Sequence, residues 1–228
     1  MRIAAIIPAL DEAGRLGATL TALEVAGIDE RIVVDGGSRD DTVAIAAAHG
    51  ASVVHSARGR ARQQNLGAAA STAEVLVFVH ADVLVPPDTV AWITRTLARP
   101  GVVAGAFRTR TRFDGAGPMP VHGHWLRLAD LRSRLGRVAY GDQAIFVRRA
   151  TFLALGGFPD QALMEDLELS RRLRRLGRMP VVPREVLVSG RRFVAQPVRA
   201  TLCCHLFPAL YDLGVPPAVL ARLWHAIR

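Results

Sequence analysis

The N-terminal half of the chain alternates short β-branched and apolar runs with segments of helical periodicity, and this alternation constrains the fold more than any other feature. Strands that alternate with helices of this length form parallel sheets, because each crossover helix returns the chain to the same end of the sheet. The expected strands are 2–8, 31–37, 51–57 and 74–80, and the expected helices are 15–27, 38–50, 60–72 and 86–99. The strand expected over 74–80 is apolar enough to lie centrally in the sheet, buried on both faces.

The alternation loosens after Pro100. Segments 102–110 and 140–149 are expected to form strands on either side of an arginine-rich stretch, and 163–177 has the spacing of an amphipathic helix. Apolar helix formers interrupted by prolines follow from about Val198. We therefore expect further helices at the C-terminal end.

A chain of 228 residues can bury a substantial core, and no repeat or linker divides it. We expect one α/β domain spanning 1–228, in which the two halves of the chain share one sheet. Half of the residues are hydrophobic and 21% are charged, which excludes a disordered tail. No apolar run approaches the roughly 20 residues of a transmembrane helix, and the first apolar run is too short for a signal peptide. We expect a cytoplasmic protein.

The charge of the chain indicates an anionic partner. The formal net charge is +9, and all 29 basic residues are arginines. The planar guanidinium can bind phosphate oxygens bidentately, so a nucleotide, a nucleic acid or an acidic membrane face would fit. The two cysteines, Cys203 and Cys204, are adjacent and lack the spacing of a zinc site, so we expect two reduced thiols.

Polar residues follow four successive predicted strands. In open α/β sheets ligands bind beyond the carboxyl ends of the strands. Each group alone could be a turn or a helix cap, but together they supply the carboxylates, glycines and arginines that a nucleoside diphosphate with a divalent cation requires. Neither the G-x-G-x-x-G nor the P-loop pattern is present, so a different nucleotide-binding scheme is needed. The groups are 11–12, 35–38, 58–62 and 80–82.

Six ordered motifs, spread over about residues 3–192, resemble the signature of family 2 glycosyltransferases of the GT-A fold. The "VVDGGS" and "HAD" variants and the small size are similar to a compact, non-membrane subgroup associated with radical-SAM or selenium-type domains and suggested for arsenosugar biosynthesis. The resemblance implies a single mixed, mostly parallel sheet flanked by helices. It also implies a nucleotide-sugar-binding half (1–110) and an acceptor-binding half with the C-terminal helices (111–228). The motifs are "IIPALDEAGRL", "IVVDGGSRDDT", "FVHADV", "GDQAIFVRR", "LGGFP" and "MEDLEL".

The resemblance implies a donor-binding set at the strand ends. The family's loop after the first strand corresponds to 8–12, and its "DDGS" motif corresponds to 35–38. The second aspartate of that motif, which often contacts the base, is Gly36 here, so the base is left open. The implied donor-binding residues are Pro8, Ala9, Leu10, Glu12, Asp35, Gly36, Arg60, Arg62, Asn65, Ala81 and Asp82.

The D-x-D motif of the family falls on His80, Ala81 and Asp82, which implies a metal site. Asp82 is the expected ligand of Mn²⁺ or Mg²⁺, since both ions prefer hard oxygen donors. His80 could be a second ligand, which would favour Mn²⁺, or an ordinary hydrogen-bonded histidine at a strand end. The pair His122 and His124, later in the chain, is kept out of the metal site.

Glu165 and Asp166 correspond to the family's catalytic pair at the start of a helix. The resemblance implies that Asp166 is the general base of an inverting enzyme, which removes the proton of the acceptor hydroxyl. The implied acceptor-binding residues are Asp142, Gln143, Gly156 and Gly157. Arg191 and Arg192 could bind the diphosphate or lie on a solvated surface.

The favoured hypothesis is a metal-dependent, inverting glycosyltransferase that moves a sugar from a nucleoside-diphosphate donor to a hydroxyl acceptor. A sugar nucleotidyltransferase is the second enzymatic interpretation, although its glycine-rich loop after the first strand is missing. A nucleic-acid-binding protein is a third, but the arginines are spread along the chain rather than gathered in one stripe. Peripheral membrane contact and a homodimer through the C-terminal helices stay open.

Overall fold

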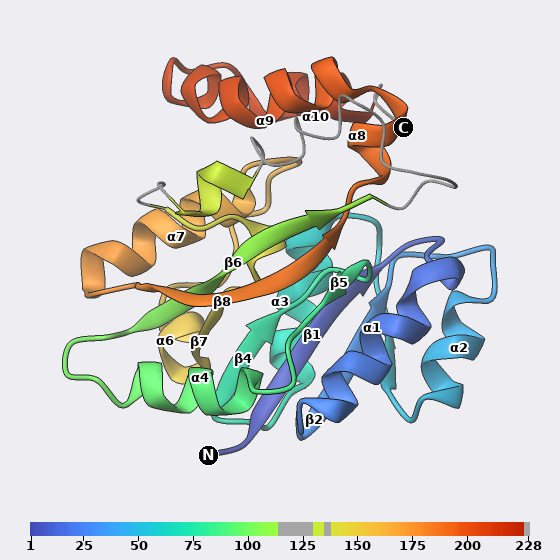
Figure 1. Cartoon of the computed structure of the whole chain (residues 1–228), viewed down its shortest axis with the longest axis vertical. Helices are drawn as coiled ribbons and strands as arrows, with labels where there is room; N and C mark the ends of the chain where they lie inside the picture. The colour runs from blue at the N-terminus through green and yellow to red at the C-terminus, as the bar shows by residue number, and fades with distance from the viewer. Residues whose placement is uncertain (114–129, 135–137, 226–228) are drawn as a thin grey trace.

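The computed structural model of the chain describes residues 1–113, 130–134 and 138–225. Its first half alternates strands and helices, which confirms the expected order (Figure 1). The helices begin and end within a few residues of their expected positions. The elements are β1 (Ile3–Ala9), α1 (Ala13–Val25), β2 (Glu30–Asp35), α2 (Thr42–Ala48), β3 (Ser52–His55), α3 (Arg60–Ala70), β4 (Val75–Phe78), β5 (Val83–Leu84) and α4 (Thr89–Leu97).

The second half contains two nine-residue strands, β6 and β8, one three-residue strand, β7, and several further helices. The expected amphipathic helix is present as α7, with three acidic residues in its first turn and Arg174 and Arg175 in its last. Such charges complement the helix dipole. The elements are β6 (Ala104–Arg112), η2 (Gly141–Gln143), β7 (Phe146–Arg148), α6 (Arg149–Ala154), α7 (Glu165–Leu176), β8 (Val181–Ser189), α8 (Arg191–Ala195), α9 (Pro197–Asp212) and α10 (Pro217–His225).

The expectation of a strand over 140–149 is confirmed only for Phe146–Arg148 and is wrong for the residues before it. Residues 141–143 form a single 3₁₀ turn, because the Gln143 side chain accepts a hydrogen bond from the Tyr140 amide at 2.9 Å and closes the turn. Ala144 then adopts the left-handed conformation at φ 46°, and the strand that follows covers only three residues. The break matters for the site, because it leaves the Gly141 amide outside the sheet.

The sheet has eight strands in the order β3-β2-β1-β4-β7-β6-β8-β5. The pairs from β3 to β4 and the pair β6–β8 are parallel, whereas β7 runs antiparallel to both β4 and β6, and β5 runs antiparallel to β8. Strands from both halves of the chain therefore share one mixed sheet. The carboxyl ends of β1 to β4 lie along one edge, where ligands bind in folds of this kind.

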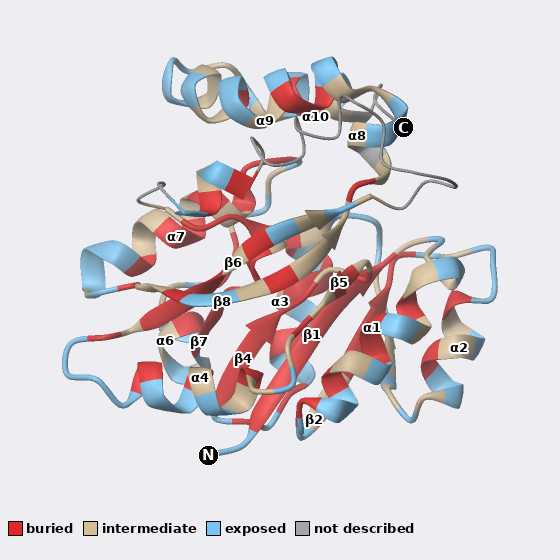
Figure 2. Ribbon diagram, in the orientation of Figure 1, coloured by how far each residue is buried: buried red, intermediate tan, exposed pale blue. Residues whose placement is uncertain are grey.

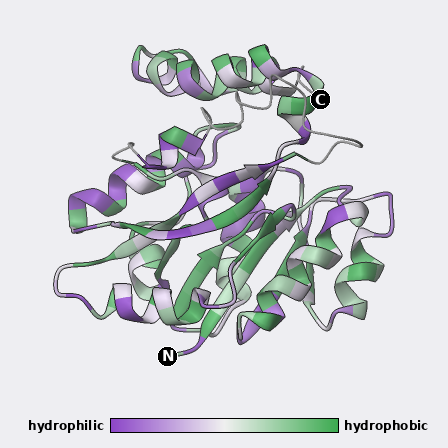
Figure 3. Ribbon diagram, viewed as in Figure 1, coloured by the Kyte–Doolittle hydropathy of each residue, from purple (hydrophilic) through white to green (hydrophobic). Residues whose placement is uncertain are grey.

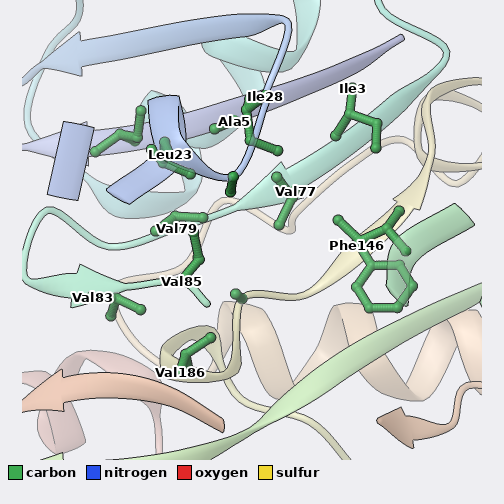
Figure 4. Close-up of a cluster of buried hydrophobic side chains, with 14 of the residues drawn as sticks. Ile3, Ala5, Leu23, Ile28, Val77, Val79, Val83, Val85, Phe146 and Val186 are labelled. Carbon is green, nitrogen blue, oxygen red and sulfur yellow. The ribbon is translucent and has the colours of Figure 1, made fainter. Parts of the chain in front are cut away.

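The core covers both faces of the sheet, and β1 shows why. Its side chains alternate between the faces, as in any strand, so that Ile3 and Ile7 pack with α1 and α4, whereas Ile6 packs with α3 and α7. All seven residues of β1 are buried, and β4 is buried on both faces as expected (Figure 2). In Figure 4, Leu23 of α1 and Phe146 of β7 lie in the same cluster as the β1 and β4 side chains.

The C-terminal helices α9 and α10 lie together at the top of Figure 1, beyond the sheet. Phe207 and Leu220 pack there in one cluster with Leu163, which precedes α7, and Leu167, which lies in its first turn. Figure 3 shows hydrophobic colour along β1 and β4, and hydrophilic colour along much of α7 and parts of β6 and β8. Among the described residues, no helix combines the length and the apolar character that a membrane crossing requires. Cys203 and Cys204 are free thiols, as expected.

Candidate active site

A cavity of about 830 Å³ opens at the carboxyl ends of β1 and β4 and extends to the C-terminal helices. Residues from both halves of the chain line it, so the cavity brings together side chains that are far apart in sequence. The predicted site residues that line it are Pro8, Ala9, Leu10, Glu12, Arg60, Arg62, His80, Ala81, Asp82, Asp142 and Asp166.

The loop after β1 is held by the loop after β2. Asp11 has the left-handed φ of 54°, and its amide donates to Ser38 Oγ at 2.9 Å while its Oδ1 accepts from the Arg39 amide at 2.7 Å. The Glu12 amide donates to Thr42 Oγ1 at 2.8 Å. These contacts between the loops fix the backbone from which the Glu12 side chain reaches the cavity.

Asp35 is buried beneath these loops rather than in the cavity lining. Its carboxylate accepts hydrogen bonds from the amides of Gly37 and Ser38 at 3.0 and 3.1 Å, and His55 Nδ1 lies 3.5 Å away. Burial opposes the charge, but the hydrogen bonds from Ser38 and Gly37 hold the pKa of Asp35 below its ordinary value. In this structure the carboxylate orders the turn that contains Gly36.

Gln63 is a structural support that the sequence did not reveal. Its Nε2 donates to the backbone oxygens of Ala9 at 2.9 Å and Val34 at 2.7 Å, so one buried amide ties the ends of β1 and β2 together. A side chain on Gly36 would lie 3.1 Å from this amide, which explains the small residue there. Gln63 belongs to a helix whose amide side chains carry no recognisable motif, so nothing in the sequence marks it.

His80 and Asp82 follow β4 and face different parts of the cavity. The turn between them is fixed by Thr19, whose hydroxyl donates to the Ala81 oxygen at 2.8 Å. His80 Nε2 lies near Gly141, since a Cβ on that glycine would be 2.8 Å from it and 3.1 Å from Asp166 Oδ2. The imidazole is thus directed toward the segment that holds Asp166.

Asp82 is suited to a divalent cation. Its Oδ2 lies 3.3 Å from Arg191 Nη2, so the carboxylate already attracts a positive charge, and its oxygens are the hard donors that Mn²⁺ and Mg²⁺ prefer. The described part of the chain contains no group of three or more His, Cys, Asp or Glu residues that could hold a metal ion. A metal at Asp82 would therefore need further oxygen ligands from a substrate or water. His122 and His124 lie outside the described residues.

Asp166 stands at the start of α7, one residue after Glu165. Its Oδ2 accepts a hydrogen bond from the Gly141 amide at 2.5 Å, and its Oδ1 accepts one from the Leu167 amide at 2.7 Å. Met164, just before the helix, has a φ of 67°, and this left-handed residue turns the chain into α7. The carboxylate is thereby oriented at the wall of the cavity.

Glu165 does not line the cavity and forms a buried ion pair with Arg60. Its Oε1 lies 3.0 Å from Arg60 Nε, and the residue is 2% exposed. Burial and the neighbouring Asp166 raise the pKa of Glu165, although Arg60 opposes this. Burial disfavours the charge of Arg60, yet Glu165, Asp166 and Asp142 raise the pKa of its guanidinium. Arg60 therefore lines the cavity as a cation that is already paired with a carboxylate.

Arg132 and Tyr140 form a second cluster beside Asp166. Arg132 Nη2 lies 3.1 Å from Asp142 Oδ2, and its guanidinium stacks 3.8 Å above the centre of the Tyr140 ring. Burial raises the pKa of Asp142, as do Asp166 and Asp82, while Arg132 opposes the shift. Arg132 and Tyr140 line the cavity but belong to no motif, so sequence reasoning missed them.

Several predicted residues support the site from outside its lining. Asn65 exchanges two hydrogen bonds with the backbone of Phe158 at 2.8 and 2.9 Å, and Gln143 Nε2 donates to the Phe107 oxygen at 2.9 Å. Gly156 and Gly157 form a tight turn, with φ of 76° and 71°. Arg62, by contrast, does line the cavity, and its guanidinium donates hydrogen bonds to the Asp160 carboxylate there.

Solved structures share this architecture. A mannosyltransferase from Pyrobaculum calidifontis in complex with GDP-Man and Mn²⁺ matches with a TM-score of 0.65 and 23% identity, over 99% of this chain and 68% of that one. Glucosyl-3-phosphoglycerate synthase from Mycobacterium tuberculosis in complex with Mn²⁺, UDP and phosphoglyceric acid matches with a TM-score of 0.57 and 22% identity, over 90% and 77% of the chains. The sheet, its helices and the cavity at the strand ends define a GT-A glycosyltransferase fold.

The chain belongs to glycosyl transferase family 2, whose sequence profile matches residues 4–153. A curated relative, glucosyl-3-phosphoglycerate synthase from Mycolicibacterium paratuberculosis (strain ATCC BAA-968 / K-10), is 36% identical over 110 residues. That match covers 42% of this chain and 33% of the relative. The chain thus aligns with about a third of this relative's length.

Proposed function

We propose that the protein is an inverting glycosyltransferase that moves a sugar from a nucleoside-diphosphate donor to a hydroxyl-bearing acceptor with the help of a divalent metal. One observation supports this above the others: Asp82 and Asp166 line the same cavity, and the Gly141 amide orients Asp166. A carboxylate for a metal and a carboxylate for a proton are the two groups that the reaction requires.

In the proposed reaction Asp166 removes the proton of the acceptor hydroxyl. The acceptor oxygen then forms a bond with the anomeric carbon while the bond from that carbon to the phosphate oxygen breaks, which inverts the configuration. The Gly141 and Leu167 amides hold the Asp166 carboxylate in place at the wall of the cavity. A metal bound at Asp82 would offset negative charge on the departing nucleoside diphosphate, so no separate general acid is required.

The donor side of the cavity is proposed to bind the nucleotide. Support comes from the fixed loop that carries Pro8 to Glu12, and from relatives solved with GDP-Man and Mn²⁺ or with UDP and Mn²⁺. Mn²⁺ is therefore the favoured metal, with Mg²⁺ as the alternative. Gly36 replaces the aspartate that often contacts the base, so both uridine and guanosine donors remain to be tested.

The acceptor side is proposed to lie between Asp142 and the C-terminal helices. Phe207 and Trp224 line the cavity there together with Leu163 and Met164, so an apolar part of the acceptor could be buried. Gln143, Gly156 and Gly157 would act through the backbone that they order. The curated relative's name specifies phosphoglycerate, but the acceptor of this chain is not assigned.

Donor binding can be tested by thermal shift. A ligand that binds only the folded state raises its melting temperature, so UDP-, GDP- and dTDP-sugars should be screened with Mn²⁺ and with Mg²⁺. We expect at least one sugar nucleotide to stabilise the wild type in the presence of metal. Asp82→Ala should lose this stabilisation, while the surface variant Asp212→Asn should keep it. Equal stabilisation of Asp82→Ala would contradict the assigned role.

Further parts of the hypothesis stay predictions. These are the radical-SAM or selenium-associated subgroup, the cytoplasmic location, and contact of the C-terminal helices with a membrane or a second copy. The last has one motive in the structure: Val198, Leu202 and Leu206 recur every four residues on α9 and are 54%, 52% and 51% exposed. Sedimentation of the protein alone and with anionic vesicles would separate the two possibilities.

A further inference from the structure

Arg191 contacts two carboxylates of the donor side at once. Its Nη1 donates to Glu12 Oε2 at 2.9 Å and its Nη2 to Glu12 Oε1 at 2.5 Å, which is a bidentate pair. The same Nη2 lies 3.3 Å from Asp82 Oδ2. The side chains of Arg191, Glu12 and Asp82 are 32%, 12% and 17% exposed, so solvent screens these charges only in part.

The fold delivers Arg191 to this point. Strand β8 pairs with β5, which directly follows Asp82. The Ser189 amide donates a hydrogen bond to the backbone carbonyl oxygen of Asp82 at 3.3 Å. The next residue is Gly190, where a Cβ would lie 2.2 Å from the Arg112 oxygen, so a glycine is required for this close approach. Arg191 then begins α8. Its place next to Asp82 follows from strand pairing and a tight backbone contact.

A divalent metal and this guanidinium cannot both bind Asp82 as they would alone. A metal would lie about 2.0–2.6 Å from its carboxylate oxygen, closer to Asp82 than Arg191 Nη2, which lies 3.3 Å from Asp82 Oδ2. Two cations on one carboxylate also repel each other. Binding of a metal at Asp82 would therefore weaken the interaction between the Asp82 carboxylate and the Arg191 guanidinium. A nucleoside diphosphate brings new oxygens that a guanidinium binds bidentately.

We propose that Arg191 is a built-in counter-cation of the donor site: it competes with the divalent metal for Asp82 while the site is free of donor, and it transfers to the diphosphate when metal and nucleotide bind together. The second step rests on the proposed function, whereas the first concerns the protein and the metal alone. The consequence is that metal binds weakly without nucleotide, so metal and nucleotide bind cooperatively.

The first step is tested by titrating Mn²⁺ without nucleotide, with calorimetry or the electron paramagnetic resonance signal of free Mn²⁺ as the readout. Arg191→Gln should bind Mn²⁺ about tenfold more tightly than the wild type, the effect of losing one charge-assisted contact at the shared carboxylate. Arg191→Lys keeps the charge but not the bidentate geometry and should lie between the two. Asp82→Asn should abolish the tight binding when combined with Arg191→Gln.

The matched control is Arg184→Gln, since Arg184 also binds a carboxylate, Asp88 at 2.8 Å, but does not line the cavity. It should leave the affinity for Mn²⁺ unchanged. If Arg191→Gln is folded by circular dichroism and binds Mn²⁺ no more tightly than Arg184→Gln, competition at Asp82 is wrong. If Arg191→Gln does not fold, the same comparison is made with Arg191→Lys, for which wild-type affinity would overturn the proposal.

The second step is tested by adding UDP or GDP to the Mn²⁺ titration. In the wild type the nucleotide should tighten Mn²⁺ binding, and in Arg191→Gln this gain should shrink by about tenfold, because the diphosphate has lost its guanidinium. An unchanged gain would overturn the transfer to the diphosphate. If neither nucleotide binds either variant while the competition for Asp82 holds, the proposed function fails at these donors and the counter-cation role stands.

Discussion

The Gly141 amide donates a hydrogen bond to Asp166 Oδ2, with 2.5 Å between the two heavy atoms. These residues are separated by 25 positions and come from different elements, η2 and α7. A Cβ at position 141 would lie 2.8 Å from His80 Nε2 and 3.1 Å from Asp166 Oδ2, so a larger residue there would displace these side chains. The contact joins the acceptor-side turn to the carboxylate that we assign as the general base.

Asp166→Asn tests that assignment. Asparagine has nearly the same size but cannot take up a proton, so we expect the turnover number to fall by about 10²–10⁴-fold, with little change in donor affinity. Turnover and donor binding should be measured separately. Glu168→Gln is the control, because Glu168 lies on the same helix and pairs with Arg172. Wild-type turnover in Asp166→Asn would show that another group takes the proton.

Removing Arg60 should destabilise the fold, because it leaves the buried carboxylate of Glu165 without its ion-pair partner. Arg60→Gln leaves Glu165 without its partner at 3.0 Å, at a cost of about 2 kcal/mol, below the range for fully buried pairs because Arg60 is partly exposed. Burial already raises the pKa of Glu165. The cost should therefore shrink as pH falls and Glu165 becomes protonated.

Urea unfolding of the wild type and Arg60→Gln at several pH values measures this. The double variant Arg60→Gln with Glu165→Gln removes both charges and should recover most of the lost stability at neutral pH. No recovery would mean that Arg60 contributes through packing rather than through the ion pair.

The Gly156–Gly157 turn permits a comparison of strain and steric clash. Both residues have positive φ, at 76° and 71°, so alanine costs about 1–2 kcal/mol at either position. A Cβ on Gly156 meets nothing within 4 Å, whereas one on Gly157 would lie 2.5 Å from Asn65 Oδ1. Gly157→Ala should therefore lower the melting temperature clearly more than Gly156→Ala. Equal decreases in melting temperature would show that the Asn65 side chain can move aside without a cost in stability.

Asp35→Asn should weaken the fold in a pH-dependent way. Although burial opposes its charge, hydrogen bonds from Ser38 and Gly37 lower the pKa of Asp35, so its ionised form stabilises the folded state above the ordinary pKa. We expect a loss of about 1–2 kcal/mol at pH 7, from weaker bonds to the Gly37 and Ser38 amides. The difference should disappear as pH falls through the lowered pKa. A difference independent of pH would contradict the role of the charge.

Much of the fold was predictable because it is encoded locally. The parallel strands β1 to β4 follow from apolar runs separated by helical periodicity, and the positions of Glu12 and Asp82 follow from where two of these strands end. The strand expected over 140–149 is shortened to Phe146–Arg148, because the Gln143 side chain accepts a hydrogen bond from the Tyr140 amide in a preceding turn. An alternation of apolar residues does not reveal that competing contact.

The partners of the site residues were not predictable. Arg60 and Arg191 were candidates for phosphate contacts, but their pairing with Glu165 and Glu12 depends on packing between distant segments. Arg132 is one arginine among 29, and only the fold places it on Tyr140 beside Asp142. Sequence spacing fixes none of these contacts, since each depends on how separate segments of the chain pack together.

The most direct test of the central claim is to identify the products released from a sugar nucleotide. The donor selected by thermal shift should be incubated with the protein and Mn²⁺, with water or a panel of hydroxyl compounds as acceptor, and followed by phosphorus NMR. We predict release of the nucleoside diphosphate, dependent on metal and on Asp82 and Asp166. Release of pyrophosphate from a nucleoside triphosphate and a sugar phosphate, with no nucleoside diphosphate from any sugar nucleotide, would contradict the proposed transfer and favour a nucleotidyltransferase.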